Sequence, residues 1–290
     1  MPMKKRNRSA IFFMLPALLV YCCVVVLPAL YTAFLSLFKW NGLGEKKFVL
    51  FRNYVNLFTT DAVFKTALKN NIIWIILTLL FTMTIALLLA MLLNRKFKGR
   101  VVYRAIFYFP YMLSWIVIGI IWKWIYNPNI GFLDSLLNLL GIQTSGAGWL
   151  SDPKIALYCV FAAALWQGVG QPMLYFLAGL QGIPQELYEA AAVDGAGKVA
   201  TFFNVTIPQL KETFVIVLAT LVIASLKVYD VVYVMTNGGP VNSTQTLASY
   251  MYAQTFSYSN LGTGSAIVVV MMVMMMVIII PYVLYTTKDE

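Results

Sequence analysis

The chain contains no histidine, few charged residues and few cysteines. The absence of histidine excludes Ser-His-Asp and Cys-His nucleophilic sites, histidine metal sites and histidine general bases. Cys22, Cys23 and Cys159 all lie in apolar runs, which indicates small buried hydrophobic residues rather than a disulfide framework or a thiolate metal site. We therefore expect no catalytic residue, no metal and no cofactor bound by this chain.

Charged residues are also scarce: they make up 11% of the 290 residues, whereas hydrophobic residues make up 61%. Soluble domains typically contain about 25% charged and about 45–50% apolar residues. One core of this size cannot enclose so much apolar surface, so lipid is expected to be the solvent for much of it. The composition predicts an integral membrane protein.

Basic residues outnumber acidic residues by 21 to 11, which gives a net charge of +10. In a soluble protein this excess would suggest a nucleic-acid partner. Here the basic residues flank apolar runs, as in membrane proteins, so we expect no nucleic-acid partner. The two main groups are Lys4, Lys5, Arg6 and Arg8, and Arg95, Lys96, Lys98, Arg100 and Arg104.

Six apolar stretches are long enough to cross a hydrocarbon layer of about 30 Å as helices. They cover about residues 11–38, 70–94, 105–126, 155–180, 208–234 and 261–286. Basic residues precede the first stretch, as in a signal peptide. However, the apolar region of a signal peptide is only about 7–15 residues long, and no A-x-A-like cleavage site follows this stretch. We expect it to remain in the protein as a membrane span.

The distribution of Lys and Arg favours a cytoplasmic N-terminus. In that orientation the inner segments carry 12 basic residues and the longer outer segments carry 7. We expect an all-α membrane protein with six transmembrane helices, both termini in the cytoplasm and one transmembrane domain over residues 1–290. The first outer loop, about residues 39–69, is expected to contain a short surface helix.

Residues 182–207, between the fourth and fifth stretches, have the pattern of two short helices joined by a turn. Pro184 suits a first helical turn, and Glu186 favours the positive end of the helix dipole. Asp194-Gly195 predicts the turn, because glycine accepts a positive φ without steric cost. Pro208 is expected to break the second helix before the fifth span.

The segment Gly195-Ala196-Gly197-Lys198 resembles the end of a phosphate-binding G-x-x-x-x-G-K-[ST] loop. The first glycine of that motif would fall on Ala192 and its Ser or Thr on Val199. Because both positions fail and no strand precedes the turn, we do not expect this chain to bind a nucleotide. Any ATP would be hydrolysed by another subunit.

The same loop resembles the EAA loop of binding-protein-dependent ABC importer permeases. The matching residues are Glu189-Ala190-Ala191, Asp194-Gly195-Ala196, Phe203 and Ile207-Pro208. Asn53-Tyr54, Lys227-Val228-Tyr229-Asp230 and Asn237-Gly238-Gly239-Pro240 resemble the sugar-permease branch, which contains the maltose transporter's larger membrane subunit and the glycerol-3-phosphate permeases. The resemblance covers nearly the whole chain. It implies the plain six-span form, without the extra N-terminal spans and large outer domain of some relatives.

The resemblance implies a transport subunit rather than an enzyme. In this family the EAA helix docks on a cytoplasmic ATPase, so we name residues 182–207 the coupling loop. Glu189 would anchor it, Gly195 would form its turn, and Ala190 and Ala191 would give a close-contact surface. From Glu186 to Lys198 the loop carries three acids and one base, which suits a basic groove on a partner protein.

The resemblance also implies partners and a location. The partners are two cytoplasmic ATPases that bind ATP and Mg, a second related permease subunit, an extracytoplasmic solute-binding protein and a carbohydrate substrate, within membrane lipid. The location is the cytoplasmic membrane of a bacterium or an archaeon.

Polar residues at mid-membrane depth are costly against lipid and should face a cavity or another helix. Lys227 and Asp230, three positions apart on one expected helix face, are predicted to form a structural ion pair. The other polar and aromatic residues either bind sugar hydroxyls and ring faces or satisfy contacts between helices. The candidate pocket residues are Trp166, Gln167, Gln171, Ser225 and Tyr229.

These observations favour a carbohydrate importer, with an oligosaccharide as the first choice of substrate. A phosphorylated polyol such as glycerol-3-phosphate is the alternative within this class. Outside it, an ion-coupled secondary carrier would need unpaired intramembrane acids or histidines, and the chain offers only Asp230 beside Lys227. A membrane enzyme or structural scaffold is the remaining alternative, and no acid-base pair or nucleophile in a cleft supports an enzyme.

Overall fold

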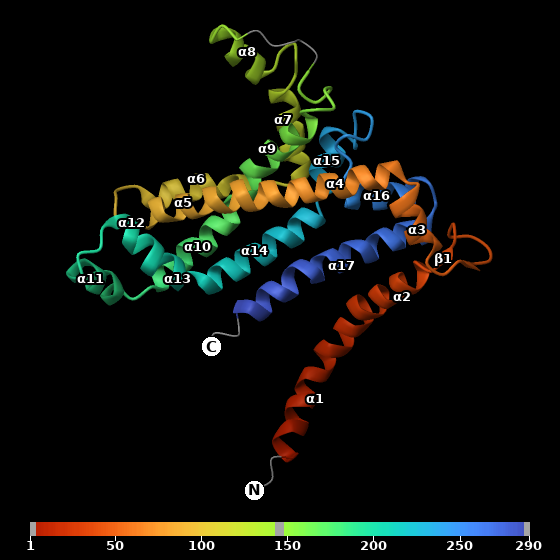
Figure 1. Ribbon diagram of the computed structural model, residues 1–290, viewed down its shortest axis with the longest axis horizontal. Coiled ribbons are helices and arrows are strands. Elements are labelled where there is room, and N and C mark those ends of the chain that lie inside the picture. Colours follow the sequence, from red (N-terminus) through yellow and green to blue (C-terminus); the bar gives the residue numbers. More distant parts are fainter. Residues whose placement is uncertain (1–3, 143–147, 287–290) are drawn as a thin grey trace. The chain divides into compact units, whose positions relative to one another are not determined.

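A computed structural model describes residues 4–142 and 148–286, and these residues are mostly helical (Figure 1). The only strands within these ranges are β1 (Phe38–Lys39) and β2 (Lys47–Phe48), which pair in antiparallel fashion. The predicted all-α class is confirmed. The chain forms two compact units: unit 1 contains Met1–Asp61 and Met251–Met272, and unit 2 contains Ala62–Tyr250 and Val273–Glu290.

Unit 1 begins with a long apolar helical segment. It comprises α1 (Lys4–Tyr21), the π-helical turn η1 (Cys22–Val26) and α2 (Leu27–Leu35). The stretch Phe13–Leu35 is long and apolar enough to cross a membrane, and its most apolar window contains no buried residue. Apolar side chains that are exposed in this way require lipid or another chain around them.

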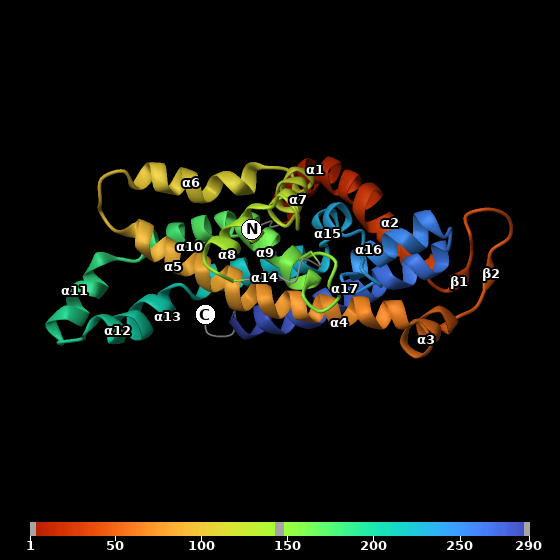
Figure 2. The same cartoon turned by 90° about the horizontal axis from the view of Figure 1, so that it is seen from above.

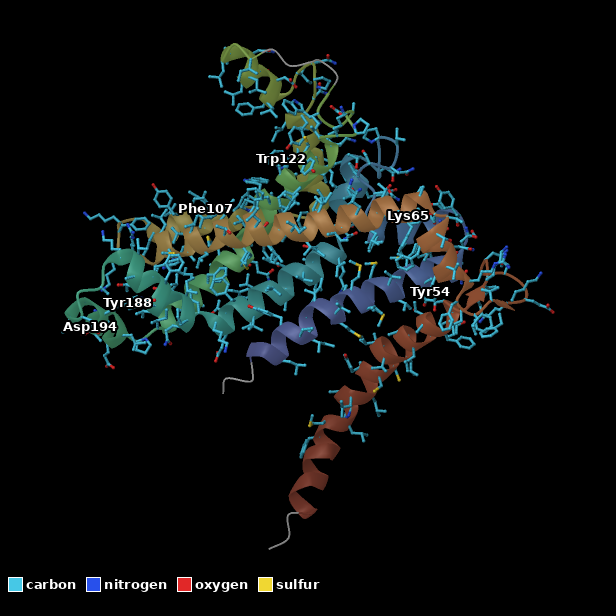
Figure 3. All side chains as sticks on the ribbon, in the orientation of Figure 1. Tyr54, Lys65, Phe107, Trp122, Tyr188 and Asp194 are labelled. Carbon is cyan, nitrogen blue, oxygen red and sulfur yellow. The ribbon has the colours of Figure 1, made fainter. Side chains whose placement is uncertain are left out.

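The rest of unit 1 connects the β1–β2 hairpin to α3 (Arg52–Thr59), η4 (Ala253–Ser257) and the first part of α17 (Leu261–Thr286). Asn53 on α3 donates from Nδ2 to the carbonyl oxygens of Ser36 and Phe38, at 2.7 and 2.9 Å. The Tyr54 hydroxyl, labelled in Figure 3, donates to Ser36 Oγ at 2.6 Å. The predicted short helix in the first outer loop is therefore present as α3, and these bonds hold it against the end of α2.

Unit 2 is built on a continuous helical rod that comprises α4 (Ala62–Leu77), the π-helical turn η2 (Thr78–Thr82) and α5 (Met83–Asn94). The rod begins at Ala62 rather than at Asn70, the predicted start of the second span. Ala86 and Ala90 of α5 are fully buried against the neighbouring helix α10 (Gly170–Gly182) (Figure 1). Small side chains allow helices in lipid to approach closely, which explains this pairing.

Two predicted spans are sharply bent. Helix α6 (Arg100–Met112) meets α7 (Trp115–Ile125) at 98°, so the third predicted span, residues 105–126, consists of parts of two helices. Leu113 between them is extended, and the Ser114 side chain caps α7 by accepting a hydrogen bond from the Val117 N–H. Such a cap begins a new helix in a new direction. In Figure 2, α6 lies beside α10.

The second bend separates the coupling loop from the fifth span. The loop contains α11 (Gln185–Val193), α12 (Lys198–Thr201) and η3 (Phe202–Thr206) and is followed by α13 (Ile207–Gln209) and α14 (Lys211–Leu226). The axis turns by 69° at Leu210, not at the predicted Pro208. Pro208 lies in the first turn of α13, where the missing N–H is tolerated.

The fifth span contains a further break, because α14 ends at Leu226 and α15 (Asp230–Met235) begins three residues after Lys227. Backbone groups that a helix no longer pairs must find other partners in a membrane protein. Asn71 Nδ2 donates to the Ser225 carbonyl oxygen at 2.9 Å, and Thr246 Oγ1 donates to that of Val228 at 2.8 Å. Asn71 also accepts the backbone N–H of Leu247 at 2.6 Å, so it fixes two irregular segments at once.

Unit 2 contains two larger apolar cores and a smaller one around Ile75, Val222 and Leu226. The first contains Trp74, Ile118, Phe161 and Val232, from α4, α7, α9 (Ala156–Gly168) and α15. The second lies where α5, α10 and α14 meet, around Met173, Phe176 and Val217. The remaining helices are α8 (Phe132–Leu139) and α16 (Leu247–Tyr252), and α16 passes from unit 2 into unit 1.

Among the described residues, three helices are individually long and apolar enough to cross a membrane, and the number rises to five if each bent pair forms one span. Helix α9 is a shorter apolar helix of this part of the chain, and α10 follows it after Val169 alone. The chain is therefore a multi-pass membrane protein.

Candidate functional site

A cavity of about 190 Å³ lies inside unit 2, among residues that belong to both apolar cores. Its walls come from the α4–α5 rod, α6, α7, α9, α10 and α14. Polar and aromatic side chains alternate with small apolar ones, and no Asp, Glu, Lys or Arg lies among the described residues that line it. The polar and aromatic members are Trp74, Thr78, Thr82, Tyr111, Trp115, Phe161, Gln167, Gln171, Thr220 and Ser225.

A chain of hydrogen bonds crosses one wall of the cavity. The Tyr111 hydroxyl donates to Gln171 Oε1 at 2.7 Å, and Gln171 Nε2 donates to the Tyr175 hydroxyl at 2.9 Å. Tyr111 stands on α6 near the bend, whereas Gln171 and Tyr175 stand one turn apart on α10. The side chains of this hydrogen-bond chain thus come from the last turn of α6 and the first turns of α10.

Two other polar atoms of the lining are buried and have no hydrogen-bond partner among the described residues. They are Gln167 Oε1 and Thr78 Oγ1. Gln167 is 3% exposed and uses its Nε2 on the carbonyl oxygens of Tyr111 and Leu113, at 3.4 and 3.3 Å. A buried acceptor without a partner costs free energy, so these atoms favour a ligand that donates hydrogen bonds.

Three of the five predicted pocket residues line the cavity: Gln167, Gln171 and Ser225. The Ser225 hydroxyl donates to the Leu221 carbonyl oxygen at 2.7 Å, so this side chain is already satisfied within its own helix. Trp166 and Tyr229 do not line the cavity. The structure therefore brings Gln167, Gln171 and Ser225 together at one cavity and places Trp166 and Tyr229 outside its lining, and a substrate role for these residues stays a prediction.

Trp166 instead joins an aromatic cluster on the α7 side of α9. Its ring lies 6.1 Å from that of Trp122, which in turn lies 5.3 Å from Tyr126 (Figure 3 labels Trp122). Adjacent residues of a helix point about 100° apart, so Gln167 and Trp166 face different neighbours. Tyr229 lies in the break after α14 and stacks on Tyr233, with ring centroids 5.3 Å apart.

The predicted ion pair between Lys227 and Asp230 is absent from the described structure. The prediction required both residues to lie on one helix face, but Lys227 ends α14 and Asp230 begins α15. The backbone of Tyr229 between them is not helical, at φ −135° and ψ −61°. Both charged side chains are exposed. In one continuous helix, residues three positions apart lie on the same face. Because the helix is broken between Lys227 and Asp230, this arrangement does not bring the two charges together.

Several lining residues were missed by sequence reasoning, above all Tyr111, Trp74, Trp115 and the threonines Thr78, Thr82 and Thr220. Aromatic residues and threonine are common in ordinary apolar spans and carry no individual signal. A hydroxyl periodicity does exist, because Thr78 and Thr82 stand four positions apart on one face of the rod. That spacing was the available clue.

The coupling loop has a well-defined helix end. Gly195 has φ +75°, in the left-handed region. Its N–H donates to the Ala192 carbonyl oxygen at 3.1 Å, and the Ala196 N–H donates to that of Ala191 at 2.9 Å. This pair of bonds is a Schellman motif, which terminates a helix around a left-handed residue. The turn predicted at Asp194-Gly195 is confirmed.

The surface of α11 is available to a partner, because none of its residues is buried. Glu189, Ala190 and Asp194 are exposed, and Ala191 and Ala196 are half-buried. One side-chain contact ties the helix to the rest of unit 2: the hydroxyls of Tyr188 and Thr206 lie 3.3 Å apart, and Thr206 is buried (Figure 3 labels Tyr188 and Asp194). The coupling loop therefore presents a short helix with acidic side chains, and the contact between Tyr188 and Thr206 holds this helix to the rest of unit 2.

The segment that resembles part of a nucleotide-binding loop lies in this same turn. Helix α11 precedes Gly195, whereas the phosphate-binding motif requires a strand at that place. Among the described residues, no group of three or more Cys, Asp or Glu side chains is arranged to hold a metal ion.

Residues 82–287 match the family described as binding-protein-dependent transport system inner membrane component. The chain belongs to this family. The match includes the coupling loop and most of the cavity, so both features lie in the part of the chain that defines the family. This permease chain is thus a transport component, and the resemblance inferred from the coupling loop is confirmed.

Relatives of known name match almost the whole permease chain. A probable ABC transporter permease protein of Pyrococcus horikoshii, PH1215, is 36% identical over 97% of this chain and 96% of its own length. The trehalose/maltose transport system permease protein MalF of Thermococcus litoralis is 34% identical over 87% of this chain and 85% of its own. Similarity to permeases of this kind places the chain in the sugar-permease branch.

The fold also matches a solved structure, that of a bacterial alginate ABC transporter in complex with an alginate pentasaccharide-bound periplasmic protein. The TM-score is 0.81 at 21% sequence identity, and the match covers 96% of this chain and 93% of the other. At this identity the similarity concerns the fold. The bent helices described above thus belong to an ABC importer fold.

Proposed function

We propose that this chain is the membrane-spanning permease subunit of an ATP-driven importer for an uncharged carbohydrate, with an oligosaccharide as the first choice. The observation that carries the proposal is the cavity lining. It combines amide and hydroxyl groups with four aromatic side chains, and it contains no charged side chain among the described residues. Sugars offer hydroxyl donors for amide oxygens and apolar ring faces for aromatic side chains.

The two buried polar atoms of the cavity that have no hydrogen-bond partner among the described residues support the same substrate class. Gln167 Oε1 and Thr78 Oγ1 need hydrogen-bond donors, and each sugar hydroxyl supplies one. The cavity, at about 190 Å³, is smaller than typical ligand pockets of about 300–1,000 Å³. We infer that a saccharide chain passes through it with only part of its length enclosed at any moment.

The alternative substrate, a phosphorylated polyol, receives no support from the cavity. A phosphate group would require Arg or Lys as a partner in a buried site, because an unpaired buried charge is very costly. Lys227, a basic residue of the fifth predicted span, is exposed and does not line the cavity.

The proposal includes six spans with both termini in the cytoplasm. The α9–α10 pair serves as the fourth span, and the bent pairs α6–α7 and α12–α14 serve as the third and fifth. Two cytoplasmic ATPases that bind ATP and Mg dock on the coupling loop through Glu189, Ala190 and Ala191. A second, related permease subunit completes the membrane channel, and a solute-binding protein delivers substrate from outside. The location is the cytoplasmic membrane of a bacterium or an archaeon.

Reconstitution tests the proposal. The chain would be co-purified with the permease, ATPase and binding protein encoded beside it and placed in lipid vesicles. We expect ATP-dependent uptake of a neutral oligosaccharide that requires the binding protein, and no uptake driven by an ion gradient alone. Exclusive uptake of phosphorylated polyols would refute the proposed substrate class, and uptake by this chain alone under a proton gradient would refute the importer.

A further inference from the structure

A second depression, a groove of about 810 Å³, lies in unit 2 beside the coupling loop. One side is formed by the residues that join α5 to α6 and by the first turns of α6, which contribute Lys96, Arg100 and Arg104. The other side is formed by α11, including Tyr188 and Glu189. With three bases and one acid among its lining residues, the groove favours an anion.

Arg104 is already oriented within this groove. Its Nη2 donates to the Leu93 carbonyl oxygen at 3.1 Å, while its Nε is buried and has no hydrogen-bond partner among the described residues. A guanidinium held at one end is fixed in orientation, and its fork of donors suits two oxygens of a tetrahedral phosphate or of a planar carboxylate. The unpaired donor is an observation independent of the charge count, and it also indicates an anionic ligand.

Apolar side chains beside the bases specify the ligand further. Val101, Val102 and Ile106 on α6 are 70%, 60% and 57% exposed, and Phe97 before the helix is 38% exposed. An acidic protein surface or free phosphate would neutralise Lys96 and Arg100 but would make no contact with these apolar groups. A molecule with an anionic head and hydrocarbon chains satisfies both surfaces at once.

We propose that this groove binds the phosphate headgroup of an anionic phospholipid, with Lys96 and Arg100 as its main charge contacts. The acyl chains lie along the exposed apolar face of α6, and Arg104 adds a third positive charge beside the headgroup. Because Glu189 lines the same groove, the charge of the headgroup acts directly on the coupling helix α11. This lipid site is a property beyond carbohydrate transport. It makes an anionic lipid a ligand of the coupling loop, on which the ATPase is proposed to dock.

The test measures lipid binding by the full chain purified in a neutral detergent. Phosphatidylglycerol and phosphatidylcholine are titrated separately, and bound lipid is counted by native mass spectrometry. We expect the wild-type chain to retain phosphatidylglycerol preferentially. The double variant Lys96→Gln/Arg100→Gln should bind it about 30-fold more weakly, since each base near an anionic surface contributes about fivefold.

Two control variants separate charge from folding. Lys39→Gln/Lys154→Gln removes the same charge from exposed positions outside the groove and should bind phosphatidylglycerol like the wild-type chain. Lys96→Arg/Arg100→Lys keeps the charge in the groove and should also retain binding. If this charge-conserving variant loses the lipid as completely as Lys96→Gln/Arg100→Gln, a headgroup held by charge is refuted.

Three further outcomes overturn the proposal. They are equal retention of the two lipids by the wild-type chain, unchanged binding by Lys96→Gln/Arg100→Gln, and complete displacement of the lipid by millimolar inorganic phosphate. The last result would assign the groove to free phosphate. Because the readout is bound lipid rather than uptake, failure of this proposal is distinguishable from failure of the carbohydrate importer.

Discussion

The cavity and the coupling loop lie in the same unit but are built in opposite ways. The loop takes its shape from neighbouring residues, since hydrogen bonds between Ala191, Ala192, Gly195 and Ala196 close its helix. The cavity region depends on distant residues: Asn71 and Ser225, 154 positions apart, hold the end of α14 beside it. The loop exposes its functional groups, whereas the cavity buries them. A change in the loop should therefore affect partners, and a change in the cavity should affect the substrate.

The largest expected effect is that of Glu189→Lys. Glu189 is exposed, so the chain should insert and fold normally, but reversal of an interface charge should weaken ATPase association at least about 30-fold. Co-purification of the ATPase and ATP-dependent uptake would measure the loss. Glu186→Lys, an exposed acid one turn away on the same helix, is the matched control and should lose less. Normal association and uptake by Glu189→Lys would remove this residue from the coupling surface.

Gly195→Val should reduce uptake about tenfold with little change in membrane insertion. The residue has φ +75°, where a β-branched side chain is strained by about 1–3 kcal/mol, although space around it is open. The strain should open the turn and misdirect α11. Gly197→Ala is the control, because Gly197 has an ordinary φ of −71° and also has open space around it. Equal losses in both variants would show that the left-handed turn has no special role.

Gln171→Met tests the cavity. The side chain keeps its length but loses both hydrogen bonds, so the Tyr111 hydroxyl has no acceptor and a sugar loses an amide. We expect the KM for uptake to rise about fivefold to tenfold, because each such bond contributes about 0.5–1.5 kcal/mol. ATPase association should not change. Tyr175→Phe removes only the far bond and should raise KM less. A loss of ATPase association in Gln171→Met would contradict the separation between the two regions.

Lys227→Gln should have the smallest effect. Lys227 is exposed, forms no ion pair with Asp230 and does not line the cavity, so unfolding stability should stay within about 0.5 kcal/mol of wild type. Thermal unfolding and uptake would be measured together with Asp230→Asn and the double variant. If the change in unfolding free energy of the double variant differs from the sum of the two single changes by more than about 0.5 kcal/mol, Lys227 and Asp230 interact, which would contradict the structure.

Local features were predictable from the sequence, because their causes lie within a few residues. Gly195 predicted the turn, the apolar composition predicted the helices, and the spacing around Glu189 predicted the coupling loop. The glutamines of the cavity were found because an amide at mid-membrane depth is costly wherever it occurs. Trp166 lies outside the cavity lining. An aromatic ring suits a sugar and a helix interface equally, and only packing distinguishes the two.

The breaks in the spans were beyond sequence reasoning. Pro110 and Ser114 lie beside Leu113, but proline and serine are also tolerated within continuous membrane helices, so they do not specify two helices at 98°. Pro208 indicated a bend two residues too early. The break after Leu226 depends on Asn71 and Thr246, which lie in other parts of the chain. Their side chains donate hydrogen bonds to the carbonyl oxygens of Ser225 and Val228. A helix in lipid breaks only where distant polar groups satisfy its freed carbonyl oxygens.

The sequence by itself determined that this protein is a membrane protein, that it contains no histidine, and that residues 182–207 resemble a loop of a known permease family. These properties follow from composition and from short-range spacing. Only the tertiary structure decided which polar residues share a cavity, that Lys227 and Asp230 are apart, and that the basic residues before α6 face the coupling helix. The physical reason is that side-chain direction within an apolar span depends on where the helix bends, and the bends are stabilised by residues far away in the chain.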